Sequence, residues 1–74
     1  MQLEYTKNAV ARMTDRGIQA TAVEAALESP DQLSPCFEKC WLARKGLQGR
    51  RLNVIFTRSL TQTLVVTAYW QESP

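Results

Sequence analysis

This chain of 74 residues contains no histidine, so arginine and lysine are the side chains best suited to bind or act on a charged partner. Residues 39–58 hold six cations and no anion, so the positive charge is concentrated in one segment. A basic cluster of this kind is the electrostatic footprint of a surface that binds phosphate groups. Lysine and arginine also guard the solvent-facing edges of sheets. The charge pattern therefore predicts either a phosphate-binding face or a solvated strand face.

Cleavage of RNA by its own 2′-hydroxyl needs a base, an acid and positive charge on the phosphate. Without histidine, arginine and lysine can hold the phosphate while a tyrosine, lysine or carboxylate moves protons. The residues that fit a catalytic role flank or follow the central strand pattern: Arg51, Arg58 and Tyr69. The remaining cations that fit nucleic-acid binding are Arg12, Arg16, Lys39, Arg44, Lys45 and Arg50.

Each candidate also has a purely structural interpretation. The arginines that flank strands are commonly solvated, and Tyr69 suits half-buried packing. Arg12 and Arg16 lie one turn apart, and they complete a pocket only if their helix crosses the open edge of the sheet. Trp70 is favoured as a core residue, whereas Trp41 suits an interface anchor or a stacking platform for single-stranded RNA.

Cys36 and Cys40 are the two cysteines, and they bracket the tripeptide FEK. In a hairpin loop their sulfurs could face each other and bond, whereas an extended chain would hold them too far apart. Free thiols are the expectation for a cytoplasmic protein. Two thiols without histidine are too few for a four-ligand zinc site, so we expect no metal and no cofactor.

The first half of the chain has the period of helices. Thr6 is a good N-cap for a first helix, and Gly17 can end it in the left-handed conformation. A second helix starts either at Thr21, where TAVE has the pattern of a capping box, or earlier, near Gln19. Pro30 excludes helical angles at the residue before it and ends this helix.

The second half changes to the period of two that strands have. RLNVIFT and TLVVTAYW are the strongest strands and are joined by the short connection RSLTQ. CWLARK is a third candidate, and DQLSPCFE is a weaker fourth that Pro35 confines to an edge. Each strong pattern places one apolar set on a single face: Leu52, Val54 and Phe56 in the first, and Leu64, Val66, Ala68 and Trp70 in the second.

These elements predict an α+β fold of one domain, residues 1–74, with two N-terminal helices packed on a three- to four-stranded antiparallel meander. A core of this size supplies only about 3–5 kcal/mol of net stability, so a homodimer or a complex is a reasonable source of further buried area. No signal peptide and no membrane-spanning apolar run is recognisable, which predicts a cytoplasmic protein without a membrane partner.

The order of landmarks resembles a family of small bacterial proteins near the RelE and BrnT toxin-like superfamily. The matching stretches are YTKNAVARMTDRGI, VEAALESPDQL, GRRLNVIF and LVVTAYW, which together span roughly residues 3–70. The resemblance implies a RelE-like or BrnT-like helix–helix–sheet topology, action on RNA as a ribonuclease, and pairing with an antitoxin protein.

Relatives of that kind more commonly carry histidine where this chain has Asn8, in a tyrosine-x-x-histidine arrangement. If that histidine is a catalytic acid or base, this chain lacks it. If it caps and anchors the first helix, asparagine is a sensible replacement because its amide can make similar local hydrogen bonds. The position of Asn8 in the first turn of a helix favours the anchoring role.

Two functional hypotheses follow. The first is a toxin-like domain that binds or cleaves RNA as a histidine-free endoribonuclease, or a degenerate relative of one. The second is a non-catalytic protein-interaction module with the same fold, acting as a homodimer. The resemblance favours the first, whereas the modest net charge of +2 and the missing histidine favour the second.

Overall fold

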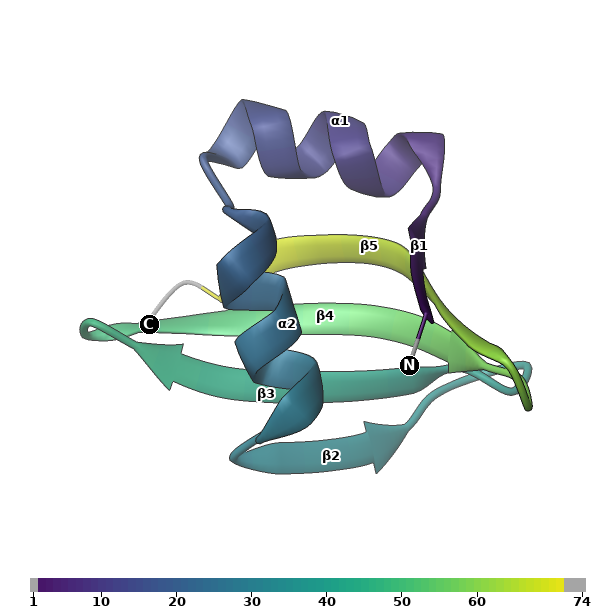
Figure 1. Cartoon of the computed structure of the whole chain (residues 1–74). Helices are drawn as coiled ribbons and strands as arrows, with labels where there is room; N and C mark the ends of the chain where they lie inside the picture. The colour runs from purple at the N-terminus through teal and green to yellow at the C-terminus, as the bar shows by residue number, and fades with distance from the viewer. Residues whose placement is uncertain (1, 72–74) are drawn as a thin grey trace.

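The computed structural model describes residues 2–71, which form two helices and one five-stranded sheet (Figure 1). The strands lie in the order β1-β5-β4-β3-β2 across the sheet. The predicted α+β class is confirmed. The elements in chain order are β1 (Gln2–Tyr5), α1 (Lys7–Arg16), α2 (Ala20–Glu28), β2 (Gln32–Pro35), β3 (Trp41–Leu47), β4 (Arg50–Arg58) and β5 (Gln62–Gln71).

The sheet is mixed, so the prediction of a purely antiparallel meander of three to four strands is wrong. β2, β3, β4 and β5 pair antiparallel with their neighbours, but β1 runs parallel to β5, with Leu3 opposite Thr63 and Tyr5 opposite Val65. A parallel partner needs a long crossover connection, which here includes both helices. The four residues of β1 become a strand only because β5, far along the chain, offers its edge.

The ends of both helices follow from local chemistry. The Thr6 hydroxyl accepts a hydrogen bond from the Ala9 amide at 3.0 Å, and Gly17 ends α1 with a φ of 66°, as predicted. α2 begins at Ala20 after Gln19, so the earlier of the two predicted starts is the right one. The capping box at Thr21 does not form, because Thr21 already lies inside the helix.

Thr6 also fastens α1 to the sheet. Its hydroxyl donates to the Val66 carbonyl at 2.7 Å, and its amide donates to the Val65 carbonyl at 3.0 Å. One side chain therefore caps the helix and ties its first turn to β5. This attachment determines where the rest of α1 lies above the sheet.

We expect Thr6→Ala to lower the free energy of unfolding by about 1–2 kcal/mol, because both hydroxyl hydrogen bonds are lost. Urea unfolding followed by circular dichroism measures this change. Thr6→Ser, which keeps the hydroxyl, is the matched control and should stay close to the native value. Equal stability of Thr6→Ala and the native chain would show that the hydroxyl does not hold α1 in place.

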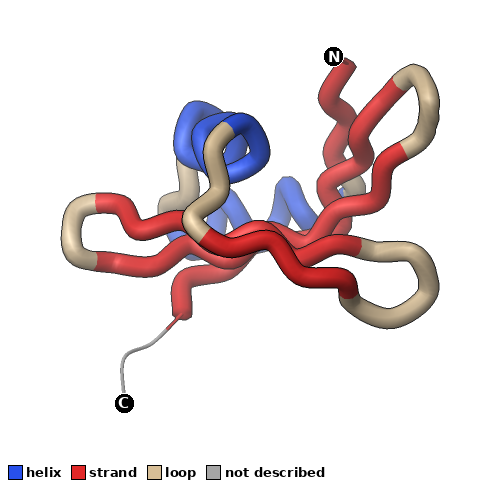
Figure 2. Tube along the Cα trace, turned by 90° about the horizontal axis from the view of Figure 1, so that it is seen from below, coloured by secondary structure: helices blue, strands red, loops and turns tan. Residues whose placement is uncertain are grey.

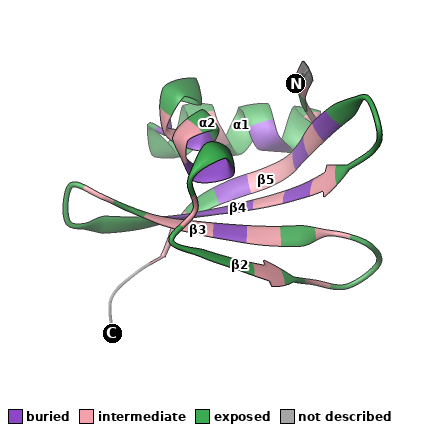
Figure 3. Cartoon of the chain, turned by 60° about the horizontal axis from the view of Figure 1, so that its bottom comes forward, coloured by how far each residue is buried: buried purple, intermediate pink, exposed green. Residues whose placement is uncertain are grey.

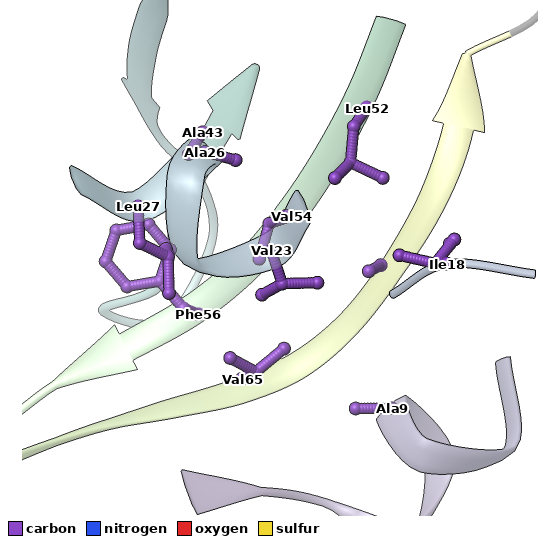
Figure 4. Close-up of a cluster of buried hydrophobic side chains, with 11 residues drawn as sticks. Ala9, Ile18, Val23, Ala26, Leu27, Ala43, Leu52, Val54, Phe56 and Val65 are labelled. Carbon is purple, nitrogen blue, oxygen red and sulfur yellow. The ribbon is translucent and has the colours of Figure 1, made fainter. Parts of the chain in front are cut away.

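Both helices lie on the same side of the sheet (Figure 2). α1 packs against β5, whereas α2 packs across β4 and β3. Buried residues on β3, β4 and β5 meet the helices, while β2 stays mostly exposed at the edge (Figures 3 and 4). The buried apolar side chains are Ala9, Ile18, Val23, Ala26, Leu27, Ala43, Leu52, Val54, Phe56, Val65 and Ala68.

A register shift on β4 and β5 corrects the predicted faces of the last strand. Ile55 lies opposite Thr67, yet the next residue, Phe56, lies opposite Val65, so one extra residue of β5 is accommodated there. Such a bulge reverses the alternation of side chains beyond it. Val65 is therefore buried in place of Leu64 and Val66, which were predicted to share the core face with Trp70.

The hairpin between β2 and β3 joins Cys36 and Cys40 in a disulfide, with their Cα atoms 5.1 Å apart. The Cys36 amide also donates to the Cys40 carbonyl at 2.9 Å. Of the two alternatives left open by the sequence, the hairpin loop is the observed one, and the expectation of free thiols is wrong. Within residues 2–71, no helix is long and apolar enough to cross a membrane.

Candidate functional site

One hollow brings together four of the residues predicted to act on nucleic acid. It has a volume of about 360 Å³ and lies where the second half of α1, the start of β4 and the end of β5 meet. We call it the arginine hollow and define it by Arg12, Arg16, Arg50, Tyr69 and Trp70. α1, which carries Arg12 and Arg16, packs against β5, whose second half is left unpaired by β1.

Trp70 joins the three elements of this hollow. Its indole N–H donates to the Arg16 carbonyl at 3.1 Å, which satisfies one of the free carbonyls at the end of α1. The Arg50 guanidinium carbon lies 4.0 Å from the centre of the indole ring, a cation–π contact. Arg50 is thus held in place by an aromatic ring, and its charge is not paired with a carboxylate of any described residue.

The arginine hollow keeps most of its positive charge. Arg16 Nε lies 3.6 Å from a carboxylate oxygen of Asp15, but both side chains are more than half exposed. A surface pair of this kind contributes little and is readily exchanged for another anion. No salt bridge involves Arg12 or Arg50 within residues 2–71. The arrangement can therefore take phosphate oxygens.

The family model for a domain of unknown function, DUF4258, matches residues 5–70. The chain belongs to the DUF4258 family. No curated protein matches it, and no solved structure does. The match spans every element of the structure except most of β1, so it covers all the residues of the arginine hollow.

The predicted catalytic trio of this DUF4258 chain is divided by the fold. Tyr69 lines the arginine hollow. Arg51 is exposed on the sheet face opposite to Arg50, because neighbouring residues of a strand point to opposite faces. Tyr69 lies opposite Asn53, so its side chain belongs to the same sheet face as Arg51 and reaches the hollow only at the edge of β5. Arg58 lies at the other end of β4, about 20 Å away along the strand, where its guanidinium carbon sits 5.3 Å from the centre of the Phe56 ring. Arg58 cannot act with the other two.

The other three predicted phosphate ligands lie outside the arginine hollow. Lys39 is in the disulfide-closed hairpin, at the opposite end of the sheet. The Lys45 ammonium donates to the Ser29 carbonyl at 2.8 Å, and so caps the end of α2. Arg44 Nη1 donates to Gln32 Oε1 at 3.3 Å on the face of the sheet without helices. The basic segment is therefore distributed over both faces and both ends of the sheet.

The same open face contains two buried polar atoms, Arg44 Nε and Asn53 Oδ1, that find no hydrogen-bond partner among the described residues. Asn53 is only 2% exposed, although it lies on the face opposite to the helices. Its amide nitrogen donates to Gln71 Oε1 at 3.3 Å, and it pairs across the strands with Tyr69. Asn53 therefore links β4 to the end of β5 on the face without helices, next to Tyr69.

Asn8 does not take the anchoring role that we predicted for it. Thr6 caps the helix, while Asn8 is exposed and makes no side-chain hydrogen bond to any residue in the described range 2–71. It lies one turn before Arg12 on the same side of α1. Tyr5 faces the other side, in an apolar hollow with Val10.

Burial, and then the nearby carboxylate of Glu24, raise the pKa of Tyr5 above its usual value of 10.0. Its phenol therefore stays protonated at neutral pH and does not serve as a base there. Among residues 2–71, no three histidine, cysteine, aspartate or glutamate side chains come close enough to hold a metal ion. The groups that the arginine hollow offers are guanidiniums from Arg12, Arg16 and Arg50 and the aromatic residues Tyr69 and Trp70.

Trp70 packs against the buried core, as predicted, but its contacts with Arg50 and with the end of α1 were not predicted from the sequence. The signal was present in the strand pairing, since Trp70 lies opposite Leu52 and Arg50 is two residues from Leu52 on the same face. Diagonal neighbours at this spacing are within reach of aromatic and long side chains. The correct register depends on the bulge, however, and nothing in the alternation of residues reveals it.

Proposed function

We propose that this DUF4258 chain is a toxin-like domain that binds single-stranded RNA in the arginine hollow. The observation that carries the proposal is that Arg12, Arg16 and Arg50, from α1 and β4, line one hollow together with Tyr69 and Trp70 of β5. Arginine presents a planar set of donors that matches phosphate oxygens. Aromatic rings provide stacking surfaces for unpaired bases.

Each side chain has a distinct part in this proposal. Arg12 and Arg16, on successive turns of α1, bind two adjacent phosphates of the strand, and Arg50 binds a third. Tyr69, which is 38% exposed, offers its ring to a base. Trp70 positions Arg50 and the end of α1 together, so it is a positioning residue more than a contact for the RNA.

Kinship with the RelE and BrnT toxins is part of the proposal. Its support is the order of elements, in which two helices precede a run of antiparallel strands on which they pack. The partner that the proposal implies is an antitoxin protein that covers the arginine hollow. An antitoxin that did so would need to supply acidic groups to the three guanidiniums.

Cleavage is a second candidate function, favoured by one observation: Tyr69 is among the residues that line the arginine hollow. A tyrosine hydroxyl is the one group in the arginine hollow that both donates and accepts a proton. Arginine cannot do so, because it stays charged at all accessible pH values. Tyr69 would thus have to accept or donate the proton that is transferred during cleavage, while the arginines hold the phosphate.

The test is a titration of fluorescently labelled single-stranded RNA with the purified protein, followed by anisotropy at several salt concentrations. Three phosphate contacts predict a slope of about −2 for the logarithm of the association constant against the logarithm of salt concentration. The RNA recovered afterwards is run on a gel, which separates binding from cleavage. Tyr69→Phe is the variant that removes only the hydroxyl, so it should abolish cleavage and preserve binding.

Lack of binding at low salt would contradict the proposed function. If the same sample formed a stable dimer in light scattering, the protein-interaction module would become the better account of the chain. Binding with no dependence on salt would also contradict the proposal, because phosphate contacts must release counterions. Slowed growth on expression, relieved by a co-expressed neighbouring gene, would support the toxin–antitoxin part.

A further inference from the structure

A second hollow shares a wall with the arginine hollow. It has a volume of about 410 Å³ and lies between the start of α2, the hairpin joining β3 to β4, and the end of β5. Figure 1 shows these segments gathered at one end of the molecule. The stacked pair of Arg50 and Trp70 lines both hollows. We call it the amide hollow and define it, beyond that pair, by Gln19, Thr21, Ala22, Leu47 and Gln48.

The lining of the amide hollow differs in kind from that of the arginine hollow. Arg50, on the shared wall, is its single charged residue among the lining residues that the structure describes. Ala22 and Leu47 give it apolar surface, and two carboxamide groups give it hydrogen-bonding capacity. The lining is therefore about as polar as it is apolar, and the volume falls within the range of about 300–1,000 Å³ that small-molecule sites have.

The two carboxamides come from different segments, Gln19 from the start of α2 and Gln48 from the turn between β3 and β4. Gln19 precedes α2 but does not use its side chain to cap the helix, and its Oε1 accepts only a long hydrogen bond of 3.5 Å from the Thr21 hydroxyl. Gln48 lies in the β3–β4 turn with a φ of 51° and makes no side-chain hydrogen bond to any residue in the range 2–71. Both amides are therefore available to a ligand.

We infer that the amide hollow takes one base of the RNA strand whose phosphates lie in the arginine hollow, and that Gln19 and Gln48 select adenine. The inference rests on the proposed function and adds a base preference to it. A carboxamide both donates and accepts, so it pairs with the N6 amino group and the N7 nitrogen of adenine, whereas guanine presents two acceptors at that edge and the pyrimidines have no such ring nitrogen. Arg50, on the shared wall, lies where the phosphate of that nucleotide would be.

In this arrangement, overall affinity and base selection depend on different contacts. Phosphate contacts contribute affinity without sequence information, whereas contacts to base edges discriminate between sequences. The arginine hollow supplies the first kind and the amide hollow the second. A strand of uridines should therefore bind through its phosphates, and a single adenine should add the contacts that the amides make.

The experiment compares labelled hexanucleotides of uridine with variants that carry one adenine, cytosine or guanine. The native protein should bind the adenine oligonucleotide about tenfold more tightly than the all-uridine one, within the range of one good bidentate contact. The test variant is Gln19→Ala with Gln48→Gly, because glycine accepts the left-handed turn at position 48. It should lower the preference to less than about twofold and leave the affinity for all-uridine RNA unchanged.

Gln62→Ala is the matched control, because it removes an exposed carboxamide at the opposite end of β5. It should keep the full preference for adenine. Equal affinity of the native protein for all four oligonucleotides would overturn the inference and leave the proposed function standing. A preference that survives in the test variant would overturn it too. Absence of binding to every oligonucleotide would overturn both the inference and the proposed function. Circular dichroism is used to confirm that each variant is folded.

Discussion

Replacement of Arg12 and Arg16 together by alanine is expected to weaken the binding of single-stranded RNA by about 100-fold. Each guanidinium that binds a phosphate is expected to contribute a charge-assisted hydrogen bond worth about 1.5–3 kcal/mol, or at least about tenfold in affinity. The salt dependence should fall in parallel, from a slope of about −2 to about −0.7, because one phosphate contact out of three remains. Fluorescence anisotropy at several salt concentrations measures both quantities.

The matched control for this double variant is Lys39→Ala with Arg58→Ala. It removes the same amount of charge from exposed positions at the other end of the sheet. If a specific site binds the RNA, the control should lose less than about threefold, through the long-range field alone. Equal losses in the two double variants would show that net charge, and not the arginine hollow, is responsible. Alanine favours helix, so Arg12→Ala and Arg16→Ala preserve α1.

The largest effect on stability is expected from Phe56→Ala. Phe56 is 1% exposed, and Figure 4 shows its ring and Leu27 of α2 pointing into the same interior. Removal of a buried ring leaves a cavity and costs about 3–5 kcal/mol. A domain of this length has about the same amount of net stability. The variant should therefore be largely unfolded at 25 °C, as far-ultraviolet circular dichroism would show.

Ile55→Ala is the control for this prediction, because Ile55 is the neighbouring residue on the half-exposed face without helices. It should cost about 1 kcal/mol and leave a cooperative urea transition. A Phe56→Ala variant that unfolds with the same midpoint as Ile55→Ala would contradict the assignment of the core to the helix side of the sheet.

Local signals allowed the helices and the four antiparallel strands to be predicted from the sequence. Thr6, Gly17 and Pro30 each act on the backbone within a few residues, so their effects are visible without the fold. β1 was missed because it depends on pairing with a strand that is distant in sequence. The bulge after Ile55 was missed for a similar reason, since the packing of α1 and α2 on the sheet selects the buried side chains there.

The candidate site was predicted in part. Arg12, Arg16, Arg50 and Tyr69 do lie together, because helical spacing puts the first two on one side of α1. Lys39, Lys45 and Arg58 are near Arg50 in sequence, but they do not line the arginine hollow. A strand sends neighbouring residues to opposite faces and carries its two ends far apart, so a basic cluster in the sequence need not become a basic cluster in space.

The missing histidine also has a structural context in this fold. Asn8 stands one turn before Arg12 on the same side of α1. A histidine at that position would place a proton donor and acceptor of nearly neutral pKa one helical turn from Arg12. Asparagine can only donate and accept hydrogen bonds there, which suits binding better than cleavage.

The measurement that tests the central claim most directly is a titration of the nitrogen-15-labelled protein with a uridine hexanucleotide, followed at its two indole N–H resonances. Trp70 lines the arginine hollow, whereas Trp41 lies at the start of β3, at the other end of the sheet. RNA bound as proposed shifts the Trp70 resonance in proportion to occupancy and leaves that of Trp41 in place. A shift of Trp41 alone, or no shift of either at saturating RNA, would contradict the assignment of RNA binding to the arginine hollow.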